Sequence, residues 1–248
     1  MKLQTLTEKF LLSYKGIYSP LTVKWYKNRF KHLVNEFGER EISQITIDDL
    51  RRLYVKLCEV KTLYKDHPHS HRKPIKKGYS KYTLHSFARA WKRLFKWSVL
   101  EEYLDSSPAE RLSLPQLPKP DPKAIDPDDL ARLFRAAQEH STKPVRDYAL
   151  LRFLASTNAR VGGTAGLKLQ DLDIDERMAK VHEKGKGGEG NVRPVFFDPE
   201  TAEALQKWLD KRANSDDSRV FMLSSSGIYQ MIKRTAEKSE EEIESPHN

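Results

Sequence analysis

An arginine beside a run of glycines is the first residue of this chain suited to phosphate chemistry. Arg160 follows an apolar helical segment, 148–154, and precedes a glycine-containing stretch, 162–166. A guanidinium presents five N–H donors in a planar fork that fits a phosphate group, so this position could bind an anion. Taken alone, the residue types favour a structural role, in which Arg160 interacts with the last carbonyls of the preceding helix.

A lysine flanked by glycines is the second such residue. Lys186 lies in the glycine-rich segment 185–188, between two short alternating runs, 178–183 and 192–197. This pattern predicts a β-hairpin. It does not satisfy the nucleotide-binding pattern Gly-x-x-x-x-Gly-Lys-Ser/Thr, which also requires a helix after the loop. A lysine on a hairpin tip can reach a neighbouring groove as a hydrogen-bond donor or proton source.

Four segments in a fixed order resemble landmarks of the tyrosine recombinase (phage integrase) family. The first resembles the end of the family's core-binding domain, the second its first catalytic box, the third its lysine-bearing turn and the fourth the opening of its second box. They are Ser-Pro-Ala-Glu-Arg-Leu at 107–112, Thr-Asn-Ala-Arg-Val at 157–161 with Gly-Leu at 166–167, Gly-Lys-Gly at 185–187 with Arg-Pro-Val at 193–195, and Ser-Pro-His-Asn at 245–248. The resemblance covers nearly the whole chain.

The resemblance implies roles for three residues. Arg160 would hold the scissile phosphate and neutralise charge in the transition state. Lys186 would be the general acid that protonates the leaving 5′ hydroxyl, with Lys184 as the alternative. His247 would assist proton transfer. The intact parent would use no metal or nucleotide cofactor, would form a 3′-phosphotyrosyl intermediate on double-stranded DNA, and would exchange strands as a tetramer.

The chain departs from the family pattern at several positions. The acid usual three residues after the first arginine is replaced by Gly163, so the support of Arg160 has to come from elsewhere. Asn158 stands where a glycine is usual, and both residue types tolerate a left-handed backbone. The sequence ends at Asn248, ahead of the second-box arginine and the nucleophilic tyrosine, which indicates a truncated catalytic domain. We interpret Tyr229 as a packing residue on an apolar helix face.

Two hypotheses follow from these departures. In the first, the chain is a DNA-binding fragment of a recombinase, unable to cleave DNA because it lacks the nucleophile. In the second, it is a naturally truncated, non-catalytic DNA-binding regulator of recombination. Arg160 and Lys186 favour the first hypothesis, whereas Gly163 and the position of the last residue favour the second.

The positive charge is concentrated in the first half of the chain. Of the net +9, residues 1–115 carry +11 and the remainder −2, and residues 61–100 hold 11 Lys and Arg against the single acid Asp66. A short charge run is usually a solvated face, but this imbalance favours a phosphate-backbone footprint. The DNA-binding residues predicted from it are Lys73, Lys76, Lys77, Lys81, Arg89, Lys92, Arg93 and Lys96.

Capping signals and proline content predict a mainly α-helical fold in two domains. Helices are expected from Pro20 to about 37, from 47 to about 60, from 81 to about 104, and from Pro127, with others near 144–158, 199–213 and 226–239. Residues 1–114 would form an all-helical core-binding domain and 123–248 a mixed α/β catalytic domain with one small antiparallel sheet. The proline-rich linker 115–122 would join them in a C-shaped clamp around DNA.

Several other protein classes are disfavoured. The single Cys58 excludes a disulfide framework and a cysteine-based zinc site, and it suits a reducing cytoplasm. The amino terminus has no signal-peptide pattern and no apolar run is long enough to span a membrane. Three alternating histidines, His67, His69 and His71, lie in a basic segment that has Asp66 as its single acid and no cysteine, so we expect loop residues near phosphate and no metal site. The expected location is the cytoplasm, at the nucleoid.

Overall fold

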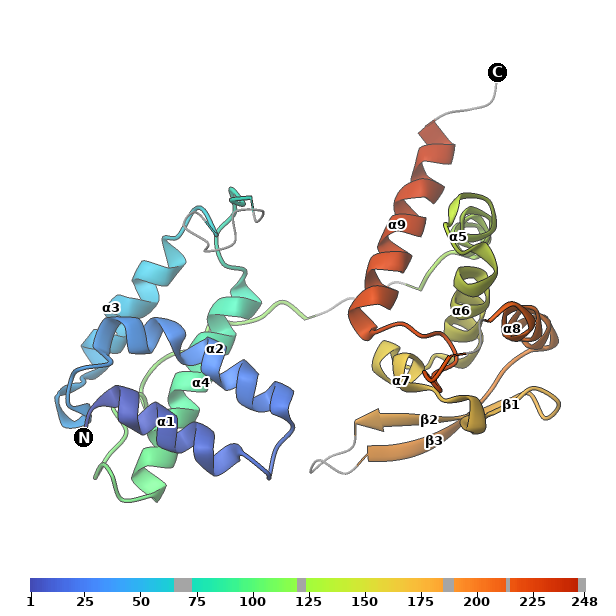
Figure 1. The fold of residues 1–248 in the computed structure, drawn as a ribbon. Coiled ribbons are helices and arrows are strands. Elements are labelled where there is room, and N and C mark those ends of the chain that lie inside the picture. The colour runs from blue at the N-terminus through green and yellow to red at the C-terminus, as the bar shows by residue number, and fades with distance from the viewer. Residues whose placement is uncertain (65–72, 120–123, 185–189, 213–214, 245–248) are drawn as a thin grey trace. The chain divides into compact units, whose positions relative to one another are not determined.

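The computed structural model describes residues 1–64, 73–119, 124–184, 190–212 and 215–244. The chain divides into two compact units, Met1–Asp121 and Pro122–Asn248, each with its own hydrophobic core (Figure 1). Within the described ranges, every helix is too short or too polar to cross a bilayer.

The first unit is helical throughout its described elements. It comprises α1 (Leu3–Tyr14), α2 (Pro20–Phe37), a 3₁₀ turn (Ile42–Gln44), α3 (Ile47–Cys58) and α4 (Lys81–Leu100). Side-chain oxygens cap the later helices: Ser19 and Ser80 accept hydrogen bonds from backbone N–H groups three residues on, at 3.3 and 3.2 Å. Thr46 and Asp49 form a reciprocal capping box. The predicted starts of α2, α3 and α4 are therefore confirmed.

Two features of this unit differ from the sequence-based expectation. Helix α1 was not predicted, although Leu3, Leu6 and Phe10 repeat at helical spacing and are fully buried. Helix α4 was expected to reach about residue 104 and ends at Leu100. Glu102 there adopts a left-handed backbone (φ 57°), and the amides of the next two residues turn back onto the Ser98 carbonyl.

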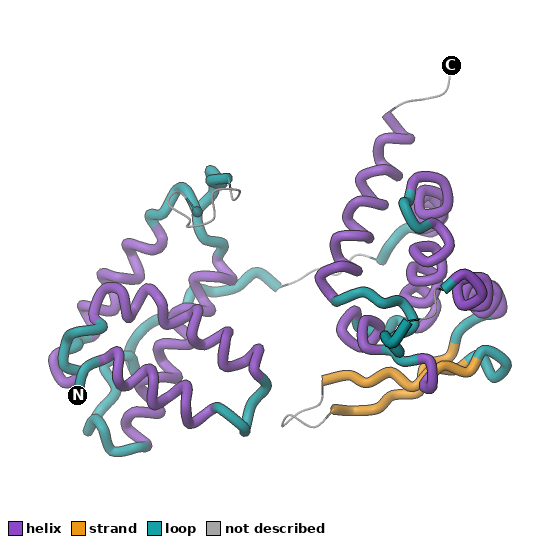
Figure 2. The backbone as a smooth tube through the Cα atoms, viewed as in Figure 1, coloured by secondary structure: helices purple, strands orange, loops and turns teal. Residues whose placement is uncertain are grey.

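The second unit combines helices with a small antiparallel sheet. Its helices are α5 (Pro127–His140), α6 (Pro144–Thr157), α7 (Val161–Gly166), α8 (Pro199–Lys211) and α9 (Ser225–Glu244), and its strands are β1 (Leu172–Asp173), β2 (Met178–Lys184) and β3 (Gly190–Phe196), in the order β1-β2-β3. Figure 2 shows the sheet along one side of this unit, with the helices on its other side. The predicted fold class, mainly helical with one small antiparallel sheet, is confirmed.

One face of β2 points into the core of the second unit. Ala179, Val181 and Glu183 alternate along the strand and are buried, while Lys180 and His182 point outward and are exposed. Helix α7 packs on this inward face. A charged residue therefore lies at the end of an otherwise apolar row, next to the start of α7.

Candidate functional site

The connection between α6 and α7 places Arg160. Asn158 is the C-cap of α6 with a left-handed backbone (φ 50°), and its N–H donates to the Leu154 carbonyl at 3.0 Å. The Thr157 hydroxyl donates to the Phe153 carbonyl and accepts from the Ala159 N–H, at 2.6 and 3.2 Å. This reversal puts Arg160 at the N-cap position of α7.

The side chain of Arg160 is held by a carboxylate from the sheet. Its Nη1 forms an ion pair with Oε2 of Glu183, and its backbone N–H donates to Oε1 of the same residue at 3.3 Å. The structural alternative considered from the sequence, in which Arg160 caps the carbonyl end of α6, is therefore wrong. Asn158 occupies that cap, and the guanidinium turns toward β2.

Glu183 binds a second guanidinium. Nη2 of Arg193, on β3, donates to Glu183 Oε1 at 3.2 Å. The carboxylate side chain is 6% exposed, whereas the side chains of Arg160 and Arg193 are 77% and 44% exposed. Burial acts to raise the pKa of Glu183, but the hydrogen bonds from the Arg160 backbone and the Arg193 side chain and the two positive charges outweigh it, so the pKa lies below its usual value. The carboxylate is ionised at neutral pH.

Gly163 is where the resemblance places an acid, and the structure explains the glycine. A Cβ atom built at this position would lie 2.3 Å from Cγ1 of Val181 and 3.4 Å from Cγ of Glu183. Strand β2 therefore fills the space that a side chain at position 163 would need. The same strand supplies the carboxylate that contacts Arg160.

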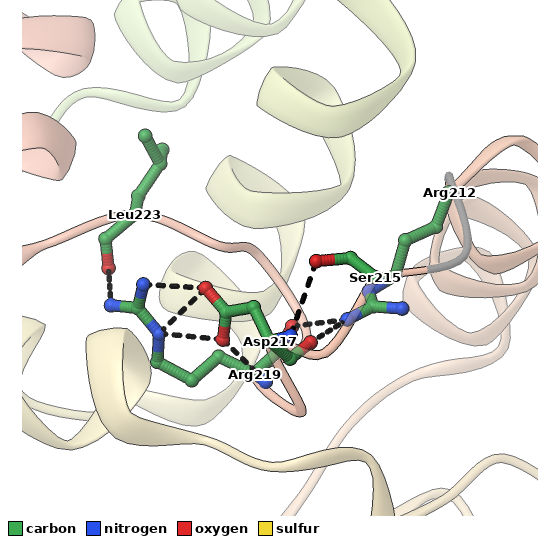
Figure 3. Close-up of polar contacts among 5 residues, drawn as sticks. All are labelled: Arg212, Ser215, Asp217, Arg219 and Leu223. Atoms are coloured by element: carbon green, nitrogen blue, oxygen red, sulfur yellow. Dashed lines mark hydrogen bonds and ion pairs between the residues drawn. The ribbon is translucent and has the colours of Figure 1, made fainter.

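A loop after α8 supports the segment that follows α7. The backbone of 167–169 bonds to this loop through Val220 N to Leu167 O at 2.8 Å and Leu169 N to Ser218 O at 2.9 Å. Within the loop, the guanidinium of Arg219 donates to both carboxylate oxygens of Asp217, as Figure 3 shows. The distance from Nε to Oδ1 is 2.9 Å, and the distance from Nη2 to Oδ2 is 2.6 Å. Nη1 of the same arginine donates to the Leu223 carbonyl at 3.2 Å, while Arg212 donates to the Asp217 carbonyl. Sequence analysis did not identify this network.

The described residues include one of the three predicted catalytic side chains. Lys186 and His247 lie outside the described residues, and the side chain of Lys184, at the end of β2, is also undescribed. Which lysine is the general acid stays a prediction. Among the described residues, no group of three or more His, Cys, Asp or Glu side chains is placed to hold a metal ion. The three loop histidines at 67–71 are outside the described ranges.

Tyr229 differs from the sequence-based interpretation. It was expected to pack on an apolar helix face and is instead 63% exposed. Helix α9 turns Ile228, Met231 and Thr235 into the core, so the residue directly after Ile228 lies about 100° around the helix from the buried row.

The predicted DNA-binding residues of α4 share one face of that helix. Positions 81, 89, 92, 93 and 96 fall within about 120° at 100° per residue, and His85, which was not among the predicted residues, lies within the same arc. Lys81, Arg89, Arg93 and Lys96 are exposed, with His85 and Lys92 partly so. Lys73, Lys76 and Lys77 precede the helix and are also exposed. Part of the positive charge of residues 61–100 thus lies along one face of α4. We call this face the basic stripe and define it as Lys81, His85, Arg89, Lys92, Arg93 and Lys96.

Three members of the basic stripe also have structural contacts, and one of them is Arg89, whose guanidinium lies over the Trp25 ring at 5.6 Å. Nζ of Lys92 donates to the Glu110 and Leu112 carbonyls at 2.8 and 3.0 Å, which ties α4 to the segment after it. Nε of Arg93 donates to the Tyr14 hydroxyl at 2.9 Å, which ties α4 to α1. Variants at these three positions would therefore affect packing as well as charge.

Comparison with known proteins identifies the family. The model of the phage integrase family matches residues 123–248, just over half of the chain. The chain belongs to the phage integrase family. Integrases and tyrosine recombinases of this family act in DNA recombination and bind DNA.

Relatives of this integrase-family chain include proteins named tyrosine recombinases. Tyrosine recombinase XerC of Oceanobacillus iheyensis is 28% identical over 236 residues, which is 89% of this chain and 71% of that protein. Tyrosine recombinase XerC of Shewanella amazonensis is 29% identical over 78% of this chain and 58% of its own length. XerC 2 of Ralstonia nicotianae is 35% identical over 60% of this chain and 41% of its own length. The chain thus spans about two fifths to seven tenths of these relatives.

Solved structures match the fold. A lambda integrase fragment (75–356), crystallised as a dimer bound to a COC′ core site, superposes with a TM-score of 0.71 at 14% identity, covering 97% of this chain and 82% of that one. The Tn1549 transposon integrase (82–397), in complex with circular intermediate DNA, gives 0.72 at 18% identity, covering 100% and 81%. At these identities the likeness concerns the fold.

Glu183 is the residue of the site that sequence analysis missed. Its signal was present in the alternation of β2, which places residues 179, 181 and 183 on the inward face. A carboxylate is almost never fully buried unless it is paired, so an acid at an inward position indicates a cationic partner. The family pattern instead predicts the acid at position 163.

Proposed function

We propose that this chain binds double-stranded DNA and carries the phosphate-binding part of a site-specific tyrosine recombinase. The observation that supports the proposal most directly is Arg160, an exposed guanidinium anchored by a buried carboxylate within the part of the chain that matches the family. Such a group can bind a non-bridging oxygen of a backbone phosphate and stabilise charge as it develops there.

In the proposed reaction of the intact protein, a tyrosine hydroxyl attacks the scissile phosphorus and the 5′ oxygen leaves. The proton that the tyrosine hydroxyl loses would pass to His247, which assists proton transfer, and the proton that the leaving oxygen gains would come from Lys186 or Lys184. The phosphodiester energy is kept in a 3′-phosphotyrosyl bond, and attack by a 5′ hydroxyl reverses the step. This scheme requires no metal or nucleotide cofactor. Strand exchange would take place in a tetramer on DNA, in the cytoplasm at the nucleoid.

These 248 residues contain no tyrosine that the resemblance matches to the nucleophile. We therefore expect the 248-residue polypeptide to bind DNA without forming a covalent adduct. Denaturing electrophoresis of the protein with a labelled, nicked duplex tests this directly. Because Tyr229 is exposed, the variant Tyr229→Phe is the control: an adduct lost in this variant would make Tyr229 the nucleophile and overturn our assignment.

The non-catalytic regulator is the second candidate function. The sequence favours it at Gly163, because the glycine leaves Arg160 without an acid three residues later. The ion pair with Glu183 removes that argument, because Arg160 has a buried carboxylate partner from β2. The recombinase fragment is therefore the better supported of the two.

The basic stripe on α4 is the proposed contact with the phosphate backbone. The double variant with Lys81 and Lys96 changed to Gln removes two exposed charges and leaves the contacts of Arg89, Lys92 and Arg93 in place. Binding of a fluorescent duplex, followed by anisotropy between 50 and 200 mM salt, should weaken and lose about one unit of log–log salt slope for each phosphate contact removed.

A matched control uses lysines of the same unit that already face an acid. Lys2 and Lys56 pair with Glu39 and Glu36 at 2.6 and 2.8 Å, and changing both to Gln should alter the slope far less. An unchanged slope in the Lys81 and Lys96 double variant, or an equal change in the control, would show that α4 does not contact the backbone.

A further inference from the structure

The carboxylate of Glu183 joins side chains from three elements of the second unit. Arg160 comes from the start of α7, Arg193 from β3 and Glu183 from β2. In the β2–β3 register, Val181 lies opposite Arg193 and Glu183 opposite Asn191, so Arg193 is diagonal to the carboxylate on the inward face of the hairpin. The three side chains form one cluster, called here the two-arginine cluster.

The charges of this cluster suit an anionic ligand. Two guanidiniums and one carboxylate leave a net charge of +1. The carboxylate is buried and the guanidiniums are exposed, so the positive groups are the ones that a ligand meets. Glu183 engages Nη1 of Arg160 and Nη2 of Arg193, and a guanidinium with five N–H donors has others to offer a phosphate.

The position of Glu183 also accounts for Gly163. A side chain at position 163 and the present packing of Val181 and Glu183 exclude each other, because a Cβ there would lie 2.3 Å from Val181. The acid that the resemblance expects on α7 therefore has no room, and a carboxylate from β2 contacts the arginine.

We propose that Glu183 is a positioning residue that orients Arg160 and Arg193 toward a single DNA phosphate, in place of an acid at position 163. This proposal rests on the proposed function, since the phosphate is that of the bound DNA. It adds Arg193 as a second phosphate ligand and assigns the support of Arg160 to β2.

The variant Glu183→Gln separates positioning from simple charge. If Glu183 only contributed a negative charge near DNA, removing it would tighten binding. If it positions the arginines, the variant weakens duplex binding. The loss of affinity caused by Arg160→Ala should then also be smaller in the variant than in the wild-type chain. We expect Arg160→Ala to cost about tenfold in duplex affinity in the wild-type chain, as for loss of a charge-assisted contact. In the Glu183→Gln background the same change should cost less than about threefold.

Two further variants complete this experiment. Glu203→Gln on α8 removes an equally charged, exposed side chain that pairs with Lys207 away from the cluster, and should leave affinity within about twofold of wild type. Glu183→Asp retains the charge and should retain most of the coupling to Arg160. It also keeps the test valid if Glu183→Gln fails to fold, which thermal unfolding would show.

A second measurement does not depend on DNA binding. The side-chain Nε–H resonances of Arg160 and Arg193 can be followed by NMR while inorganic phosphate is added. One binding curve shared by both arginines in the wild-type chain, weakened at least about tenfold in Glu183→Gln and largely retained in Glu183→Asp, is the expected result. A shift of one arginine alone, or equal phosphate affinity with and without the carboxylate, would overturn the proposal.

The two measurements distinguish the possible failures. A chain that binds phosphate at both arginines but does not bind duplex DNA refutes the proposed function and leaves the cluster in place. A chain that binds duplex DNA with no coupling between Glu183 and Arg160 refutes the positioning role and leaves the proposed function intact.

Discussion

Adding one methyl group at Gly163 should destabilise the second unit measurably. The Cβ of Gly163→Ala would lie 2.3 Å from Cγ1 of Val181, far inside the usual contact distance of about 3.5–4.0 Å between carbon atoms. Val181 is fully buried on β2 and β-branched, so its χ1 has few other rotamers. Relief therefore requires α7 and β2 to move apart.

The neighbouring glycine provides the matched control. A Cβ at Gly162 would meet no atom within 4 Å, and both glycines lie in α7. Replacing glycine by alanine in a helix is worth up to about 1 kcal/mol, so Gly162→Ala should be neutral or stabilising. Gly163→Ala has the same gain in helix propensity, but it also has an overpacking cost of about 1–3 kcal/mol. The difference between the two variants should thus be about 1–3 kcal/mol.

Hydrogen exchange measures this difference within one unit of the chain. Peptides covering 144–157 and 178–184 report opening of the second unit, and peptides covering 81–100 in the first unit provide an internal reference. The variant Val181→Ala removes two buried methyl groups, which should lower the opening free energy by about 0.8 kcal/mol for each group. In the Gly163→Ala background the same change should lower it by less, because it also removes the carbon that the new Cβ contacts. Equal opening free energies for the Gly162 and Gly163 variants, within about 0.5 kcal/mol, would refute the steric account of the glycine.

Three further predictions concern the supports of each unit. The side chain and backbone of Arg219 hold the pKa of Asp217 at about 2, below an unfolded value of about 3.9. This pair therefore adds stability above about pH 4 that is lost as the pH falls toward 2, and Asp217→Asn should reduce that loss in acid unfolding followed by circular dichroism. Asn158→Val should cost about 1–2 kcal/mol at its left-handed backbone, whereas Asn158→Gly should be nearly neutral, as urea unfolding would show. Thr46→Ala should lower the opening free energy of α3 by about 0.5–2 kcal/mol in hydrogen exchange and leave the second unit unchanged.

Elements with local signals could be predicted from the sequence. Pro20 after a capping serine, the Thr46–Asp49 box and Asp126-Pro127 each predicted a helix start that the structure confirms. Capping is local chemistry between residues two or three apart, so it can be read from adjacent residues. Helix α1 shows the limit of this approach: it begins at Leu3 without a side-chain cap, and its apolar spacing is the only signal.

The site was harder to predict because its partners come from different elements. Arg160 was found from the order of motifs, while its partner is 23 residues away on β2. Register decides which side chains meet across two elements, and local sequence does not specify how α7 packs on β2. The predicted packing role of Tyr229 was wrong for a related reason. Which face of α9 is buried depends on the elements that pack against this helix, and local sequence does not specify them.

A carboxylate on β2 has a different mechanical consequence from one on α7. An acid three residues after Arg160 would brace the arginine within its own short helix. Glu183 instead ties Arg160 to the hairpin, and it lies one residue before Lys184 and three before Lys186, the two candidates for the general acid. A displacement of the strand that moves the candidate lysines would therefore move the anchor of Arg160 as well. In the proposed reaction, the anchor of Arg160 and the candidate general acid Lys184 would lie one residue apart in β2, so the distance between them would be kept when the strand moves.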